Sequence, residues 1–355
     1  MNHQKAIPVR LILALLSLFV LVGCATAPSS SGGGSSSSNG DMPAWFLDPQ
    51  SVYSDDQYLT AIGTGDTRRA AEQSAMAGLS QIFESEINVD VNTAERYRDL
   101  VGPSGSVSES ELMLAQSTSV QSNQTLLNVQ FGEAAVDGEG RVHVIAYINR
   151  METGRIYQDL IQKNGSFVVD YLEDYRAAAD PVRKYAYVSA AAVVAQSNAL
   201  LLDQLRIISQ PFYAMTDVPY ELREVQQAKL DTAATMTIKI DVAGNAGDRV
   251  ASAIREALSE ERFPTADPAL ITIGGEVSIE PIELNPKYKA VRWYLSLSFI
   301  GPDGRALVTY DNQDRAQAVT AESAQSFAYD DIDEAVKREF VASIRDYFDG
   351  LVLGN

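Results

Sequence analysis

The sequence is poor in cysteine and histidine: 355 residues include one cysteine and two histidines. Cys24, the single cysteine, has no partner for a disulfide. His3 lies near the N-terminus. His143 lies in RVHVIAY, where alternation places it opposite the face of Val142 and Val144 and predicts a solvent-exposed strand histidine. Zinc sites of the Cys/His kind are therefore excluded, and any Ser-His-Asp triad would have to use His143.

Positive charge is also scarce. The chain carries 28 lysines and arginines against 47 aspartates and glutamates, a net charge of −19. Loss of residues 1–23, which contain Lys5 and Arg10 but no acidic residue, would lower the net charge by two more, to −21. A protein this acidic does not bind nucleic acid or anionic head groups non-specifically, so no nucleic-acid partner is expected.

The apolar run near the N-terminus is short. Leu11–Val22 spans twelve residues, whereas a bilayer core needs ~20. Lys5 and Arg10 precede the run and small residues follow it, which is typical of an export signal. We therefore expect a signal peptide over residues 1–23.

Two processing sites are possible behind this signal. ATA at Ala25–Ala27 would release a soluble protein, whereas LVGC at Leu21–Cys24 resembles the lipobox of bacterial lipoproteins. The lack of a disulfide partner for Cys24 favours the lipobox. This resemblance implies three acyl chains on Cys24, which together form a lasting anchor at ~0.8 kcal/mol per buried methylene. Ala25 in the next position favours the outer membrane, with the protein facing the periplasm.

A Ser/Gly-rich tether separates this anchor from the rest of the chain. Its residues 25–40, ATAPSSSGGGSSSSNG, have a root-mean-square reach of roughly 22 Å. The fold class that we predict is α+β, with two small antiparallel sheet-plus-helix modules joined by a long helical hairpin. The predicted segments are a lipidated cysteine and tether at 24–40, a first module at 41–150, a helical region at 151–230 and a C-terminal module at 231–355.

The pattern of the first module is strand, helix, strand, strand. We expect a strand at Tyr58–Ile62, a helix from about Thr67 to Ile87 and a strand at about Thr125–Val136. Ser/Thr/Gln/Asn-rich sequence with GPSGS at Gly102–Ser106 precedes the second strand. DGEG at Asp137–Gly140 predicts a hairpin turn into an alternating return strand.

The helical region divides at Asp180 and Pro181, which predict an N-cap and a first helical residue. A helix from Pro181 to Arg206 would be ~39 Å long. Its apolar seam is mostly alanine, which lets another helix approach closely. A free-standing antiparallel hairpin and a two-helix layer over a sheet both fit this pattern.

The C-terminal module repeats the α+β pattern. A helix at Asp248–Arg262 follows a first strand, and VRWYLSLSF alternates clearly, with Tyr294 on its polar face. GPDG at Gly301–Gly304 predicts a turn, and Ile332, Val336, Phe340, Ile344 and Phe348 predict a closing amphipathic helix.

Carboxylate pairs are abundant in so acidic a chain. The densest lie at Glu173 and Asp174, at Glu260 and Glu261 and at Asp330 and Asp331. Helix capping or a solvated helix face accounts for each of them. The stretch DNQD at Asp311–Asp314 approximates a calcium loop only weakly. We predict no catalytic, cofactor-binding or metal-binding residues.

The stretch IGTGDTRR resembles half of a dinucleotide-binding fingerprint. Arg68 fills the position of the third glycine, and Asp66 at the start of the helix would repel phosphate. We interpret Asp66 or Thr67 as a helix N-cap, and Gly63 and Gly65 as residues that permit a sharp strand-to-helix reversal.

Together with its flanks, this stretch resembles the LPP-twenty lipoprotein family of bacterial envelope proteins. The residues that carry the resemblance are Pro43, Trp45, Tyr58, Ala61, Gly63, Gly65, Ala71, Ala75 and Gly78. The arrangement is also similar to the first domain of flagellar assembly protein T. The resemblance implies a non-enzymatic protein with envelope or flagellar partners and no small-molecule cofactor, and Trp45, Gly63, Gly65 and Asp66 form its structural motif.

Three functions are compatible with the sequence. The first is a lipid-anchored structural or adaptor protein. The second is an activator of a cell-wall synthase, because GGEVSI and RWYLSLSFIGPDGRAL resemble the small domain of lipoprotein activators of penicillin-binding proteins and the TolB amino-terminal domain. The third is a hydrolase that uses carboxylates such as Glu173, Asp174, Asp330 and Asp331.

Overall fold

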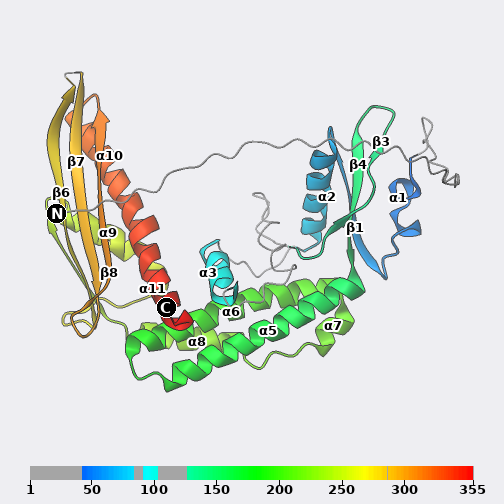
Figure 1. Cartoon of the computed structure of the whole chain (residues 1–355), viewed down its shortest axis with the longest axis horizontal. Coiled ribbons are helices and arrows are strands. Elements are labelled where there is room, and N and C mark those ends of the chain that lie inside the picture. The colour runs from blue at the N-terminus through cyan, green and yellow to red at the C-terminus, as the bar shows by residue number, and fades with distance from the viewer. Residues whose placement is uncertain (1–41, 84–90, 103–125, 286, 355) are drawn as a thin grey trace, which may run out of the picture. The chain divides into compact units, whose positions relative to one another are not determined.

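The structure is a computed structural model that describes residues 42–83, 91–102, 126–285 and 287–354. Residues 42–354 belong to one compact unit. Helices and two four-stranded sheets occur in separate parts of this unit, which confirms the predicted α+β class (Figure 1).

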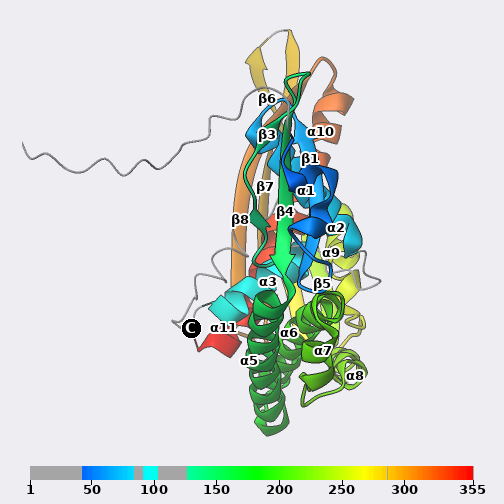
Figure 2. The same ribbon diagram turned by 90° about the vertical axis from the view of Figure 1, so that its right-hand side faces the viewer.

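The first sheet has the order β1-β4-β2, with β3 also bonded to β4. All its pairings are antiparallel, as predicted. Helix α2 covers one face of β1 and β4, and the short helix α1 lies on the other face (Figures 1 and 2). The elements are α1 (Ala44–Leu47), the 3₁₀ turn η1 (Pro49–Ser51), β1 (Tyr58–Gly65), α2 (Arg68–Ile82), α3 (Val91–Val101), β2 (Gln130–Phe131), β3 (Ala135–Val136) and β4 (Val142–Asn149).

Two details of this module differ from the prediction. The strand expected over Thr125–Val136 is reduced to β2 and β3, because Asn128 has a left-handed φ of 54° that an extended strand cannot continue through. Helix α3 was not predicted. The GPSGS loop, the residues that follow it up to 125 and the predicted end of the first helix beyond residue 83 lie outside the described residues. The hairpin turn at Asp137–Gly140 is present.

Helices α5 (Arg150–Ala177) and α6 (Pro181–Ile208) form the predicted antiparallel pair. Asp180 caps α6 as expected, because its carboxylate accepts the amide N–H of Arg183 at 2.8 Å. Buried Asn164 and Asn198 bond across the pair at 3.3 Å, which fixes the alignment of the two helices. The shorter helices α7 (Gln210–Met215) and α8 (Leu222–Ala233) follow.

The helix pair completes two hydrophobic cores, so it is not a free-standing stalk. Tyr157 and Leu205 belong to the core beneath the first sheet, whereas Val182 and Tyr185 belong to the core of the C-terminal module. Helix α6 is long and apolar enough to span a membrane by composition, but 72% of its most apolar stretch is buried inside the protein. It is therefore a core helix.

The second sheet has the order β5-β6-β7-β8. The expectation of a purely antiparallel sheet is wrong for its first pair, because β5 and β6 run parallel. Helix α9 connects these two strands, and a helical crossover returns the chain in the same direction. The elements are β5 (Ile238–Gly244), α9 (Gly247–Ala257), the 3₁₀ turn η3 (Ser259–Glu261), β6 (Ile271–Asn285), β7 (Tyr288–Ile300) and β8 (Ala306–Ala318).

Three consecutive helical segments close the chain: α10 (Ala321–Glu334), the π-helical turn η4 (Ala335–Phe340) and α11 (Val341–Leu353). The predicted amphipathic residues point into the core, as Ile332, Phe340 and Phe348 are at most 4% exposed. In Figure 1, α9, α10 and α11 lie on one side of the second sheet, and no helix of the described ranges lies on its other face.

Candidate functional site

Gly63 lies inside β1 and Gly65 ends it, and both permit close packing and not, through a left-handed φ, the sharp reversal that we expected. Neither has a positive φ. A Cβ atom on Gly63 would lie 2.1 Å from the carbonyl oxygen of Ala71, and one on Gly65 would lie 2.6 Å from the Cβ of Ala70. The two glycines therefore let α2 lie directly on the strand.

Thr67, and not Asp66, caps α2. The Thr67 hydroxyl accepts the amide N–H of Ala70 at 3.2 Å, whereas Asp66 is exposed. This hydrogen bond uses the Ala70 N–H, one of the backbone donors at the helix start that a bound phosphate would need. Trp45 is 7% exposed on α1, where its ring meets that of Phe46 edge-on.

His143 is buried, so the prediction of a solvent-exposed histidine is wrong. It is 4% exposed, because the ring of Phe46 lies 4.6 Å from it and covers the second face of β4. Its Nδ1 lies 2.9 Å from the Thr64 hydroxyl, and its Nε2 lies 2.8 Å from an Asp137 carboxylate oxygen. The hydrogen bond from His143 lowers the pKa of Asp137 to about 2, and backbone N–H groups of the turn contribute.

The chain Thr64–His143–Asp137 has the order of a hydroxyl, an imidazole and a carboxylate. Thr64 faces His143 because the two residues are paired in the β1–β4 register. Asp137 begins the hairpin turn and also accepts the N–H groups of Glu139 and Arg141. These bonds fasten the turn to the sheet. In addition, His143 is a base beside the Thr64 hydroxyl, and a base next to a hydroxyl is the minimal arrangement for an activated nucleophile.

The predicted carboxylate pairs do not form a common site. Glu173 and Asp174 are exposed on α5, and Asp330 and Asp331 are exposed on α10, a helix that does not pack on α5. Within the described ranges, no three His, Cys, Asp or Glu side chains are placed to hold a metal ion.

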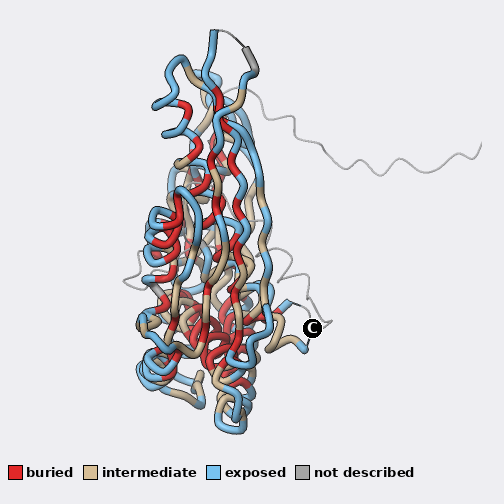
Figure 3. The backbone as a smooth tube through the Cα atoms, turned by 90° about the vertical axis from the view of Figure 1, so that its left-hand side faces the viewer, coloured by how far each residue is buried: buried red, intermediate tan, exposed pale blue. Residues whose placement is uncertain are grey.

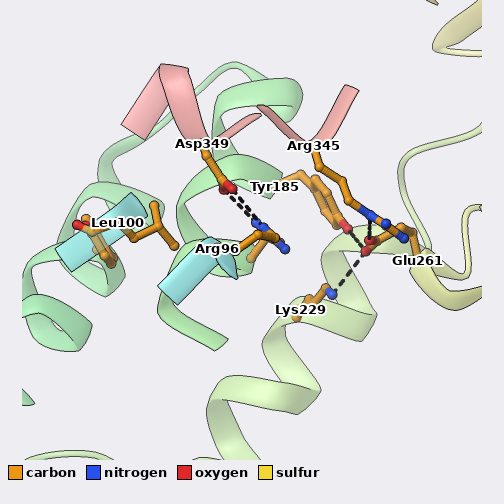
Figure 4. Close-up of polar contacts among 9 residues, drawn as sticks. Arg96, Leu100, Tyr185, Lys229, Glu261, Arg345 and Asp349 are labelled. Atoms are coloured by element: carbon orange, nitrogen blue, oxygen red, sulfur yellow. Dashed lines mark hydrogen bonds and ion pairs between the residues drawn. The ribbon is translucent and has the colours of Figure 1, made fainter. Parts of the chain in front are cut away.

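Glu261 differs from the carboxylate pairs on α5 and α10, because it is buried. It ends η3 and is 9% exposed. One carboxylate oxygen lies 3.0 Å from Nζ of Lys229 on α8, and the other lies 3.5 Å from Nε of Arg345 on α11. The hydroxyl of Tyr185 on α6 donates a further hydrogen bond to it (Figure 4). Glu261 therefore joins three helices distant in sequence.

A second charge pair lies beside Glu261. Arg96 of α3 donates two hydrogen bonds to Asp349 of α11, at 2.8 Å from Nε and 2.6 Å from Nη2 (Figure 4). Nη2 also donates to the hydroxyl of Ser189 on α6 at 3.2 Å. This bidentate pair connects α3 to the C-terminal helix. We call Arg96, Tyr185, Lys229, Glu261, Arg345 and Asp349 the Glu261 cluster.

The electrostatics of the Glu261 cluster keep Glu261 and Arg96 ionised and Tyr185 protonated. Burial raises the pKa of Glu261, but Lys229, the Tyr185 hydrogen bond and Arg96 outweigh burial and bring it down to about 2. Burial, followed by the Glu261 charge, raises the pKa of Tyr185 well above its ordinary value, so Tyr185 remains a donor. Burial lowers the pKa of Arg96, and Asp349 more than compensates.

A cleft of about 510 Å³ adjoins the cluster, lined by residues of α3, α6, α8, η3 and α11. Its lining includes Arg96, Lys229, Glu261 and Arg345, all of which have partners. These ion pairs hold the helices together, because separating two paired charges inside the protein would leave each of them buried without a partner.

In the sequence, Glu261 is one of many acidic residues, and no local pattern distinguishes Arg96. Ala94, Tyr97 and Val101 recur at spacings of three and four, and this signal could have predicted α3. Nothing local could have paired Arg96 with Asp349, since 253 residues separate them.

Comparison with known proteins bears out the resemblance of the first module. Residues 43–149 match the model of the LPP20 lipoprotein family. The match supports a lipoprotein of the bacterial envelope. No curated protein matches the sequence significantly. Cys24 lies outside the described residues, and its lipidation stays a prediction.

Three solved structures are similar in part. A candidate lipoprotein from Caulobacter crescentus CB15 is 12% identical, with a TM-score of 0.27, over 34% of this chain and 96% of its own. A minor lipoprotein from Acinetobacter baumannii is 12% identical, with a TM-score of 0.26, over 31% and 94%. The secreted protein HP1454 from Helicobacter pylori is 15% identical, with a TM-score of 0.33, over 82% and 97%. Because every TM-score is below 0.5, none of these structures assigns a role to this chain.

Proposed function

We propose that this chain, whose first module matches the LPP20 lipoprotein family, is a lipid-anchored adaptor of the bacterial outer membrane that faces the periplasm. It acts through contacts with other proteins, which we expect among envelope or flagellar-ring components, and needs no small-molecule cofactor. The family match together with the lipobox at Leu21–Cys24 carries the proposal.

The two sheets supply edges suited to such contacts. β1 and β8 are each hydrogen-bonded to one neighbouring strand only within the described sheets. An edge strand presents backbone groups that a partner strand can pair with. In the second sheet Tyr294 lies on the inner strand β7, so the edge that we expect a partner to use beside it is β8.

Crosslinking in intact cells followed by affinity purification tests the proposal. Envelope or flagellar-ring proteins should be recovered reproducibly with the full chain. Replacing Gln313 on β8 by proline removes a backbone N–H that here donates to the Asn312 side chain at 2.8 Å, and the kinked edge should reduce recovery of a partner bound there. Glu322→Gln, on the surface of α10, serves as the control. Failure to recover any reproducible partner would contradict the adaptor role.

Hydrolysis is a second candidate, favoured by the bonds that His143 makes with Thr64 and Asp137. Purified chain would be assayed with activated esters and with glycan substrates. Thr64→Val should abolish genuine ester turnover, and Thr60→Val, on the same face of β1, should not. Activity that survives Thr64→Val would exclude Thr64 as the nucleophile.

A further inference from the structure

The uncovered face of the second sheet carries a polar groove of about 550 Å³. Figure 3 looks onto this face, and no described helix lies in front of the strands. Six side chains that face the groove come from three neighbouring strands: Glu276 and Ser278 from β6, Tyr294 and Ser296 from β7, and Asp311 and Gln313 from β8.

The strand register arranges these side chains in two rows across the sheet. Tyr294 lies between Ser278 and Gln313, and Ser296 lies between Glu276 and Asp311. The rows are two residues apart along each strand, roughly 7 Å, and the two carboxylates are separated by two strand spacings, roughly 10 Å. The ring of Tyr294 therefore lies next to the row Glu276–Ser296–Asp311, which has a carboxylate at each end.

Tyr294 is the aromatic centre of the groove. It is 38% exposed, whereas Trp293 and Leu295, which point to the other face, are each 2% exposed. Its hydroxyl accepts a hydrogen bond from Nη1 of Arg292 at 3.3 Å, which holds the phenol on the strand surface. Its cross-strand neighbours, Ser278 and Gln313, are not aromatic, so the phenol ring is the one π-face in this row.

The lining selects among ligand classes. Glu276 and Asp311 place two carboxylates in the lining, against one guanidinium, that of Arg292, which donates to the Tyr294 hydroxyl beside the groove, so the lining disfavours an anion. An apolar ligand would strip water from hydroxyl, amide and carboxylate groups without replacing their hydrogen bonds. A neutral, hydroxyl-rich ring meets both requirements: its C–H face packs on Tyr294, and its hydroxyls donate to Glu276 and Asp311. We propose that this groove binds a neutral oligosaccharide.

The open shape of the groove favours a chain of sugars over a single one. Its floor is the sheet itself, and it crosses three strands, so successive units can follow the surface. This site requires no protein partner and goes beyond the adaptor role proposed above. An N-acetylated glycan and a plain one share the same ring chemistry, and the experiment separates them.

Calorimetric titration of the full chain tests the proposal, in a detergent whose head group is not a sugar. The probes are the tetramer of N-acetylglucosamine, cellotetraose and, as a cationic competitor class, putrescine. We expect saturable binding of at least one tetrasaccharide and none of putrescine. Binding of putrescine alone, or of no probe, would overturn the proposal.

Variants locate the binding. Tyr294→Ala should weaken it about tenfold, the loss of one stacking contact, and Tyr294→Phe should retain most of it. Glu276→Gln and Asp311→Asn should each weaken binding. The matched control is Tyr288→Ala, a similarly exposed tyrosine on the same strand but outside the groove. Circular dichroism verifies folding, and oligosaccharide binding unaffected by Tyr294→Ala would refute this site.

Discussion

Gly63 determines how closely α2 approaches β1. A methyl group there would meet backbone atoms at 2.1 Å, and backbone cannot rotate away. We expect Gly63→Ala to destabilise the protein by more than about 3 kcal/mol. Gly138→Ala, where nothing lies within 4 Å, should cost less than about 0.5 kcal/mol. Denaturant unfolding compares the two, and equal midpoints would contradict the close-packing role.

Glu261 makes stability depend on pH in a defined direction. Its pKa is about 2 in the folded protein against an ordinary value of 4.5, so the unfolded chain binds the proton more tightly. The stabilisation is complete above about pH 5 and is lost as the pH falls towards 2, and it amounts to about 3 kcal/mol.

The comparison that isolates this effect uses Glu261→Gln. The variant should be less stable than the wild type at pH 7, and the difference should shrink as the pH falls towards 2. Denaturant unfolding at several pH values measures it. Glu139→Gln removes an exposed carboxylate and should follow the wild-type profile. A Glu261→Gln curve parallel to that of the wild type would show that the cluster does not hold the charge.

At the scale of elements, a buried ion pair fastens α3 to α11, in addition to the packing of Leu100 and Val101 in the core formed with α5 and α6. Arg96→Met removes both hydrogen bonds to Asp349 and leaves its carboxylate unpaired in a buried position. We expect amide hydrogen exchange in residues 91–101 to accelerate at least tenfold. Arg98→Met, on the exposed side of the same helix, should have little effect. If residues 91–101 exchanged their amide hydrogens equally fast in both variants, the Arg96–Asp349 pair would not be what holds α3 in place.

The elements that sequence predicted best are those with local signals. Asp180 and Pro181 start α6, and the alternation around Trp293 predicts β7, because caps and side-chain periods act within a few residues. The parallel direction of β5 and the burial of His143 depend on neighbours remote in sequence. For the same reason the Glu261 cluster had no sequence signature, whereas the polar face around Tyr294 was visible as alternation.

At the scale of the whole molecule, we expect Cys24 to decide where the protein resides, because its lipidation is the predicted membrane anchor. Without the thiol no acyl chain can be attached, and the acidic remainder has little affinity for an anionic membrane. We expect Cys24→Ser to move the protein from the membrane fraction to the soluble fraction, and mass spectrometry should register the lost acyl mass. Ser30→Ala, in the tether, should stay with the membrane. A Cys24→Ser protein still bound to membranes would rule out the lipid anchor.

The family match ends at residue 149, and α5 begins at Arg150. Yet the core beneath the first sheet also contains Tyr157, Leu201 and Leu205, which lie beyond the match. The segment that matches the family is therefore shorter than the segment that is needed to form a complete hydrophobic core. Any chain that carries this module alone must close the same apolar face with some other element, so transplanting the module into another protein requires the helix pair or a replacement for it.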